Sequence, residues 1–150
     1  MSITFSIDPG KNGAVVLWSG EEIIAINNLE YTGARINLLW LKEIFQDHTP
    51  RRLVIEDVHV SPRMGVTSAG NFMYSLGAIH AAAAMTGTEI IRITPQKWKV
   101  IVGLYERHKG AALIKVGELL PPAALDLING YKNSLDRAEA ALIGVASTRI

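Results

Sequence analysis

The stretch that decides the fold is ITFSIDPGKNGAVVLW, residues 3–18. Two apolar runs flank the turn PGKNG, in which Pro9-Gly10 and Asn12-Gly13 can each reverse the chain. The stretch therefore predicts a β-hairpin. Its first strand is apolar enough to be buried, yet it ends on a carboxylate, Asp8. The role of that acid is the first question that the sequence raises.

Three further strands are expected along the chain. EEIIAINNL at 21–29 continues the hairpin, RRLVIEDVHV at 51–60 carries an apolar run into Glu56, and TEIIRI at 88–93 is rich in β-branched residues. The segment between the last two, SPRMGVTSAGN at 61–71, contains Pro, Gly and Ser and predicts a loop.

Helices are expected between and after these strands. Apolar residues spaced by three and four predict an amphipathic helix through Ile36 and Ile44, and helix-forming residues predict another at 71–85. Thr94 can cap a helix that has Pro95 in its first position. A helix at 109–120 ends at Pro121-Pro122, and the last helix starts near Asn133 or Ser134.

This order of elements predicts an α/β fold, with a mixed five-stranded sheet flanked by helices and its later strands parallel to the first. We find no repeat, low-complexity segment or linker. A length of 150 residues suits one compact unit. A single domain over residues 1–150 is therefore expected.

Composition narrows the class of protein. Hydrophobic residues make up 49% and charged residues 19%, which is ordinary for a soluble globular domain. The chain has no cysteine, which excludes disulfides and zinc-thiolate sites and favours the cytoplasm as its location. The N-terminus lacks a secretory pattern, and the longest apolar stretch, 76–85, is too short to span a bilayer. No membrane role is expected.

The formal net charge of +1 gives little support for a global nucleic-acid footprint. Positive charge is nevertheless concentrated in one region of the chain, where only Glu106 opposes it. The basic residues there are Arg92, Lys97, Lys99, Arg107, Lys109 and Lys115. A solvated helical face and a phosphate-binding patch both explain this concentration.

Four acids are expected to meet. If the strands that end at Asp8 and Glu56 are parallel neighbours, both carboxylates face one crevice at the edge where open α/β sheets place their sites. Asp136 and Glu139 are three residues apart on the last helix, so both point to nearly the same side. The alanines beside them would let that helix pack closely on the sheet.

Clustered carboxylates repel one another and raise their pKa values unless cations neutralise them. Oxygen ligands suit Mg²⁺ or Mn²⁺, and two such ions in one site activate water and stabilise the leaving oxygen in phosphodiester hydrolysis. The plain alternative is that single acids after strands are common, and that an acidic pair three residues apart is usually solvated surface.

Four motifs resemble those of the RuvC-type Holliday-junction resolvases of the ribonuclease-H-like superfamily, particularly the short phage versions. They are SIDPG at 6–10, VIEDV at 54–58, ITPQKWK at 93–99 and SLDRAEAALIGVA at 134–146. The resemblance spans most of the chain, and the order and spacing of the motifs make it specific. It implies a ribonuclease-H-like fold and a structure-selective endonuclease that resolves four-way DNA junctions by paired phosphodiester hydrolysis.

The resemblance also assigns residues. It implies that Asp8, Glu56, Asp136 and Glu139 bind two Mg²⁺ or Mn²⁺ ions. It also implies that Lys109, alone or with Lys115, contacts the scissile phosphate or its neighbours. The wider set of expected DNA contacts is Lys97, Lys99, Arg107, Lys109, Lys115, Arg63 and Phe72.

Two positions depart from the family pattern. Glu139 stands where the family more often has Asp, and His59 stands where bacterial members have an aromatic residue that stacks at the junction centre. Phe72, Met64 or Tyr74 can replace that aromatic, because stacking needs only a flat or apolar side chain. Core packing is the competing interpretation of Phe72 and Tyr74.

The two-fold symmetry of a four-way junction suggests a homodimer with two sites, acting in the cytoplasm of a bacterium or a phage-infected host. Gly77 and the alanines after it give the middle helix a small apolar surface, which suits either a partner or packing on the sheet. Other ribonuclease-H-like nucleases, acting on flaps, forks or RNA–DNA hybrids, would use the same acids. A branched-DNA-binding module without catalysis is another alternative, whereas an actin-like or sugar-kinase ATPase needs two lobes and a longer chain.

Overall fold

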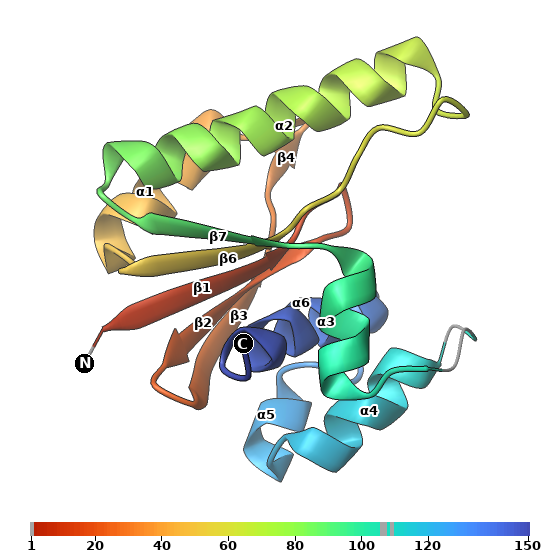
Figure 1. Ribbon diagram of the computed structural model, residues 1–150. Coiled ribbons are helices and arrows are strands. Elements are labelled where there is room, and N and C mark those ends of the chain that lie inside the picture. Colours follow the sequence, from red (N-terminus) through yellow and green to blue (C-terminus); the bar gives the residue numbers. More distant parts are fainter. Residues whose placement is uncertain (1, 106–107, 109) are drawn as a thin grey trace.

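The structure is a computed structural model that describes residues 2–105, 108 and 110–150. Its centre is a five-stranded sheet in the order β3-β2-β1-β6-β7 (Figure 1). The strands are β1 (Ile3–Asp8), β2 (Ala14–Ser19), β3 (Glu22–Asn28), β6 (Arg52–Glu56) and β7 (Glu89–Ile93). The first three are antiparallel, and β1, β6 and β7 are parallel. The predicted hairpin and mixed sheet are confirmed.

Helices cover both faces of the sheet (Figure 1). One face carries α1 (Leu38–His48) and α2 (Val66–Met85). The other carries α3 (Pro95–Val102), α4 (Ala111–Leu119), α5 (Pro122–Asp126) and α6 (Ser134–Ser147). No helix in the described ranges is both long and apolar enough to cross a membrane.

Alternation along the strands divides the interior into two cores. In β1, Phe5 and Ile7 pack with the residues of α1 and α2, whereas Ser6 bonds to α6 on the opposite face. In β6, Leu53 belongs to the first core and Val54 to the second. A period of two therefore directs the last residues of both strands, Asp8 and Glu56, toward the α3–α6 layer.

Several predicted helix ends are confirmed. The Thr94 hydroxyl accepts a hydrogen bond from the Lys97 amide at 3.2 Å, with Pro95 in the first position of α3. The last helix, α6, starts at Ser134. The helix before the proline pair ends at Leu119, and the predicted start at residue 109 lies outside the described residues.

Other boundaries were wrong. The predicted loop at 61–71 contains the first turns of α2, whose start at Val66 is 91% exposed. These turns carry no apolar pattern of their own. They extend a helix that is held on the sheet by the buried residues Ile79 and Ala83, and adding residues to an existing helix has a low free-energy cost. The strand predicted at 51–60 is shorter than expected: β6 ends at Glu56, which pairs with Ile93 at the end of β7.

Three short elements were not predicted. They are α5, which begins at the second residue of the proline pair, and a two-stranded sheet made by β4 (Tyr31–Thr32) and β5 (Arg35–Ile36). Ile36, expected in a helix, lies in β5, and the helix begins after Asn37, whose side-chain oxygen accepts from the Trp40 amide at 3.1 Å.

Candidate active site

Two of the predicted acids stand at adjacent strand ends. Ile7 pairs with Ile55 in the parallel β1–β6 ladder, and the next residues are Asp8 and Glu56. The turn after β1 folds back closely: the Gly13 amide donates to the Gly10 carbonyl at 3.0 Å, and a Cβ at Gly13 would collide with the Asp8 carbonyl. Glycine at this position therefore lets the turn pack under Asp8, which is 6% exposed.

The other two acids, Asp136 and Glu139, lie on α6. The Ser6 hydroxyl on β1 donates to the Ala140 carbonyl at 2.8 Å and accepts from the Trp18 indole N–H at 2.8 Å. This buried link joins β1 to α6 two residues before Asp8 and one residue after Glu139. This link fixes the position of α6 along β1.

A second set of bonds holds the start of α6. The Asn133 amide nitrogen donates to the Asn12 carbonyl at 3.0 Å and to Asn28 Oδ1 at 2.8 Å. Arg137, which is 5% exposed, donates to the same Asn28 oxygen at 3.0 Å and lies 3.6 Å over the Tyr131 ring. The turn after β1, the end of β3 and the start of α6 are thus joined beside Asp136. Sequence reasoning missed these supporting residues.

The four acids form one electrostatic cluster. Burial, the negative charges of Glu56, Glu139 and Asp136, and a hydrogen bond with Glu139 together raise the pKa of Asp8 to about 9. Burial also raises the pKa of Asp136. The pKa of Glu139 is raised by burial first and by the Glu56 charge second, while Lys99 opposes the shift. These charge interactions link the four carboxylates, and their predicted catalytic and metal-binding roles stay predictions.

The donor chemistry of this cluster fits Mg²⁺ or Mn²⁺, because all four side chains offer hard oxygen ligands and their negative charge needs a proton or a cation to balance it. Within residues 2–105, 108 and 110–150, no three Asp, Glu, His or Cys side chains are already arranged as ligands around one point.

Helix α3 adds two side chains to the site. Trp98 is fully buried, and its indole N–H donates to Glu56 Oε1 at 2.9 Å. Lys99 is exposed and lies with Glu139 along a groove of about 690 Å³ between α3, α4 and α6. Sequence reasoning included Lys99 among the DNA contacts but missed Trp98, whose place in the ITPQKWK motif does not show where its indole points.

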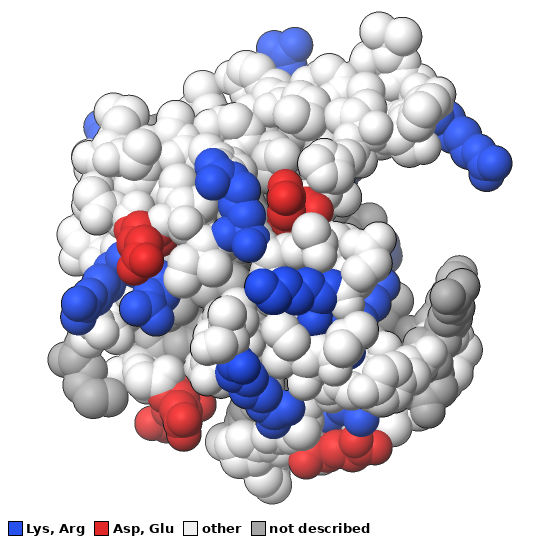
Figure 2. Space-filling view, viewed as in Figure 1, with Lys and Arg blue, Asp and Glu red and all other residues white. Residues whose placement is uncertain are grey.

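The basic residues are distributed unevenly. Lys97 is exposed on α3, whereas the Lys115 ammonium is paired with Glu118 at 2.9 Å, one turn along α4. The face seen in Figure 2 carries mostly Lys and Arg among its charged side chains and is hollowed between α2 and the α3–α4 layer. The predicted contacts Arg107 and Lys109 lie outside the described residues.

The remaining predicted DNA contacts belong to the connection after β6 and to α2. Arg63 is exposed in that connection, and Phe72 is half-buried in α2, on the opposite side of the sheet from α6. Met64 is 36% exposed and Tyr74 39% exposed. Their contact with DNA stays a prediction.

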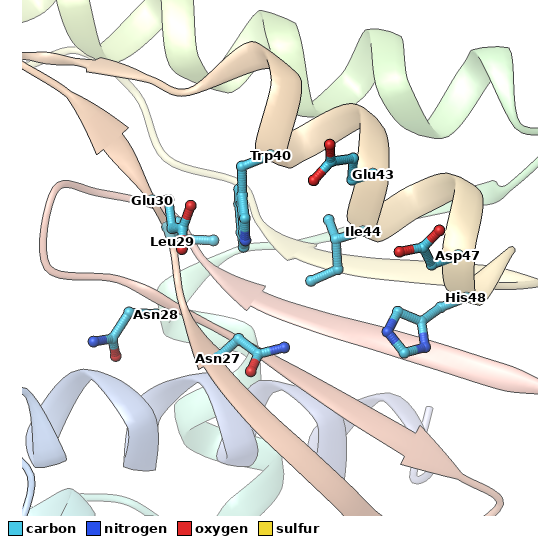
Figure 3. Close-up of a pocket in the computed structure, with 9 residues that line it drawn as sticks. All are labelled: Asn27, Asn28, Leu29, Glu30, Trp40, Glu43, Ile44, Asp47 and His48. Atoms are coloured by element: carbon cyan, nitrogen blue, oxygen red, sulfur yellow. The ribbon is translucent and has the colours of Figure 1, made fainter.

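A separate pocket of about 590 Å³ lies between the end of β3 and α1 (Figure 3). Its lining includes Glu30, Glu43 and Asp47, together with His48, and none of the four clustered acids. This pocket lies on the α1 face of the sheet, whereas α3 and α6 cover the other face.

No protein-family model matches the sequence, and no curated protein is recognisably similar to it in sequence. The fold of the chain is, however, similar to those of several solved structures. Thermus thermophilus RuvC in complex with a Holliday junction substrate superposes with a TM-score of 0.68 at 15% identity, over 99% of this chain and 96% of that one.

Two further resolvases superpose almost as well. The fowlpox virus Holliday junction resolvase gives a TM-score of 0.65 at 16% identity, over 97% of this chain and 96% of that one. The yeast mitochondrial Holliday junction resolvase gives 0.61 at 15% identity, over 99% and 78%. At such identities these likenesses show the fold, and the predicted ribonuclease-H-like architecture is confirmed.

Proposed function

We propose that this chain is a metal-dependent endonuclease that resolves four-way DNA junctions by paired phosphodiester hydrolysis. One observation carries the proposal: four carboxylates meet at the carboxyl ends of β1 and β6 and on α6, within a fold that proteins described as Holliday junction resolvases share over nearly the whole chain. We infer that residues 1–150 act as one nuclease unit in the cytoplasm.

In this proposal Asp8, Glu56, Asp136 and Glu139 hold two Mg²⁺ or Mn²⁺ ions. The ions would activate water and stabilise the leaving oxygen of the cut strand. Asp8 supplies the fixed point, because β1 lies in the middle of the sheet between β2 and β6. The α6 acids can adapt more easily, since their side chains are only partly buried.

Basic side chains would hold the DNA backbone next to the acids. Lys99 already lies near Glu139, so a phosphate bound there would sit beside the cluster. Lys109 is the proposed contact to the scissile phosphate, where a cation stabilises developing negative charge. The further proposed contacts are Lys97, Arg107, Lys115 and Arg63, with Phe72 as the side chain that stacks at the junction centre.

We also propose a homodimer formed through α2. This helix contains no Asp, Glu, Lys or Arg over its 20 residues. One side packs on the sheet through Ile79 and Ala83, but apolar residues also cover the side that faces solvent, where Met73 is 47% and Met85 is 86% exposed. A helix that is apolar on both sides is expected to be buried on both.

A panel of labelled DNA substrates tests the proposal. With Mg²⁺ or Mn²⁺, we expect the purified protein to cut a four-way junction at symmetrically related positions and to leave unbranched duplex intact. Equal cleavage of the duplex would refute a resolvase. Preference for a flap, a fork or an RNA–DNA hybrid would point to another nuclease of this fold, and binding without cutting would point to a non-catalytic module.

A further inference from the structure

The indole of Trp98 makes a direct contact with the acid cluster. The side chain is fully buried in α3, and its Nε1–H donates to Glu56 Oε1 at 2.9 Å. An indole is neutral and can only donate. It therefore orients the Glu56 carboxylate without cancelling the negative charge that a metal ion would need.

The direction of this donor is fixed by the helix and the core around it. Helix α3 is capped by Thr94 at its start and ends at Gly103, which has a left-handed φ of 75°. Trp98 packs in the same core as Ile93 and Val102. Turning the indole away from Glu56 would open a cavity in this core, so the donor stays where the carboxylate needs it.

The hydrogen bond from Trp98 differs from several other buried side-chain bonds because its acceptor is a carboxylate. A hydrogen bond to an ionised acceptor is about twice as strong as one between neutral groups. Ser6, Trp18 and Thr88 are also buried, but their polar atoms meet a hydroxyl or a carbonyl. Trp98 instead bonds to one of the four clustered acids, and it does so through one of the two carboxylate oxygens of Glu56, Oε1.

We propose that Trp98 is a positioning residue that holds Glu56 in the orientation for binding a divalent metal ion. The proposal rests on the function proposed above, because it requires Glu56 to be a metal ligand. Partners that orient metal ligands typically contribute about 10- to 100-fold in metal affinity or activity.

The test measures Mn²⁺ binding to the full chain without DNA, by the electron paramagnetic resonance signal of free Mn²⁺. Trp98→Phe keeps a buried ring and loses the donor, and we expect it to weaken Mn²⁺ binding about tenfold. Trp40→Phe is the control, since it removes an indole from α1, which packs on the opposite face of the sheet from α3 and α6. We expect its Mn²⁺ affinity to match that of the unmodified protein.

A double-mutant cycle with Glu56→Gln separates positioning from a general packing effect. If Trp98 acts through Glu56, Trp98→Phe should cause no further loss of Mn²⁺ affinity in the Glu56→Gln background. A structural role alone would give the same loss in both backgrounds, and that result would overturn the proposal.

A measurement that keeps Trp98 in place covers the case in which Trp98→Phe does not fold. The chain has three tryptophans, and so three indole N–H resonances. We expect Mg²⁺ to shift the Trp98 resonance in the unmodified protein and to leave it unshifted in Glu56→Gln. An unshifted Trp98 resonance in a protein that does bind Mg²⁺ would overturn the positioning role and leave the proposed function standing. Failure of the unmodified protein to bind Mn²⁺ or Mg²⁺ would refute both.

Discussion

Asp8 and Glu56 stand at the ends of two neighbouring parallel strands, directly after the paired residues Ile7 and Ile55. The sheet thus places two like charges side by side, and α6 adds Asp136 and Glu139 to them. Such a cluster is unfavourable without a cation. The fold maintains it through bonds made outside the cluster, notably the link from Ser6 to Ala140.

Asp8→Asn should abolish cleavage while preserving DNA binding. The amide has nearly the shape of the carboxylate but lacks its charge, so the site loses the ligand that the sheet holds most rigidly. Because a bound metal contributes several kcal/mol of transition-state stabilisation, we expect the single-turnover rate on a four-way junction to fall by at least about a hundredfold. A gel-shift assay in Ca²⁺ should show unchanged junction affinity, and an Asp8→Asn variant that cuts at the normal rate would remove Asp8 from the site.

The metal-free protein should lose stability as pH rises. The pKa of Asp8 is 3.8 in its ordinary state and about 9 in the folded protein, so between these values the folded state binds more protons than the unfolded state. The free energy of unfolding then falls with pH, by at most about 1.4 kcal/mol per unit, from about pH 4 to about pH 9. Below that window the contribution of the protonated group is fully present.

Urea unfolding in EDTA at several pH values measures this slope. Asp8→Asn should flatten it, because the amide does not titrate, and the variant should be more stable than the unmodified protein near pH 8. Saturating Mg²⁺ should also flatten it, since a bound ion stabilises the folded state. The same slope in Asp8→Asn would show that another group titrates.

Lys99→Met should weaken junction binding more than Lys115→Met. Lys99 is exposed beside Glu139, whereas the charge of Lys115 is already paired with Glu118. Loss of one phosphate contact should reduce the slope of log affinity against log salt by about one. Lys42→Met, on the exposed side of α1 and across the sheet from Lys99, is the control and should leave the slope unchanged. Equal effects of the three substitutions would mean that junction binding depends on net charge and not on the position of the lysine.

The sheet and the four acids were readable from the sequence because both depend on local patterns. Alternating residues define β1 and a continuous apolar run defines β6, and each strand ends on an acid, so parallel pairing alone brings Asp8 to Glu56. The spacing of Asp136 and Glu139 then places both on one side of a helix. The metal, the dimer and the DNA substrate stay predictions.

What the sequence did not reveal depends on packing between distant segments. The bond from Trp98 to Glu56 spans 42 residues, and that from Arg137 to Asn28 spans 109. Both hydrogen bonds depend on how the helices pack on the sheet, and a local sequence pattern does not predict that packing. The early start of α2 at Val66 escaped prediction for the opposite reason, since exposed turns bury nothing and so need no apolar pattern.

Ala81→Glu should convert the proposed dimer into monomers. Ala81 is exposed on the uncovered side of α2, where a carboxylate would be buried without a partner if two copies met there. Sedimentation velocity at micromolar concentration should show a dimer for the unmodified protein and a monomer for the variant. Ala123→Glu, which places the same charge at an exposed position of α5, should stay dimeric. A monomeric unmodified protein, with and without junction DNA, would refute the dimer.

Gly144→Ala should destabilise the protein through the contact between α6 and β2. A Cβ at this position would lie 2.5 Å from the Trp18 indole nitrogen, which is held by its hydrogen bond to Ser6. Either α6 or Trp18 must move, and overpacking of this kind costs about 1–3 kcal/mol. Gly117→Ala in α4 is the matched control, because that glycine faces open space and its replacement should stabilise the helix by about 1 kcal/mol. Urea unfolding of both variants gives the comparison, and a Gly144→Ala variant as stable as the unmodified protein would show that α6 does not pack this closely on Trp18.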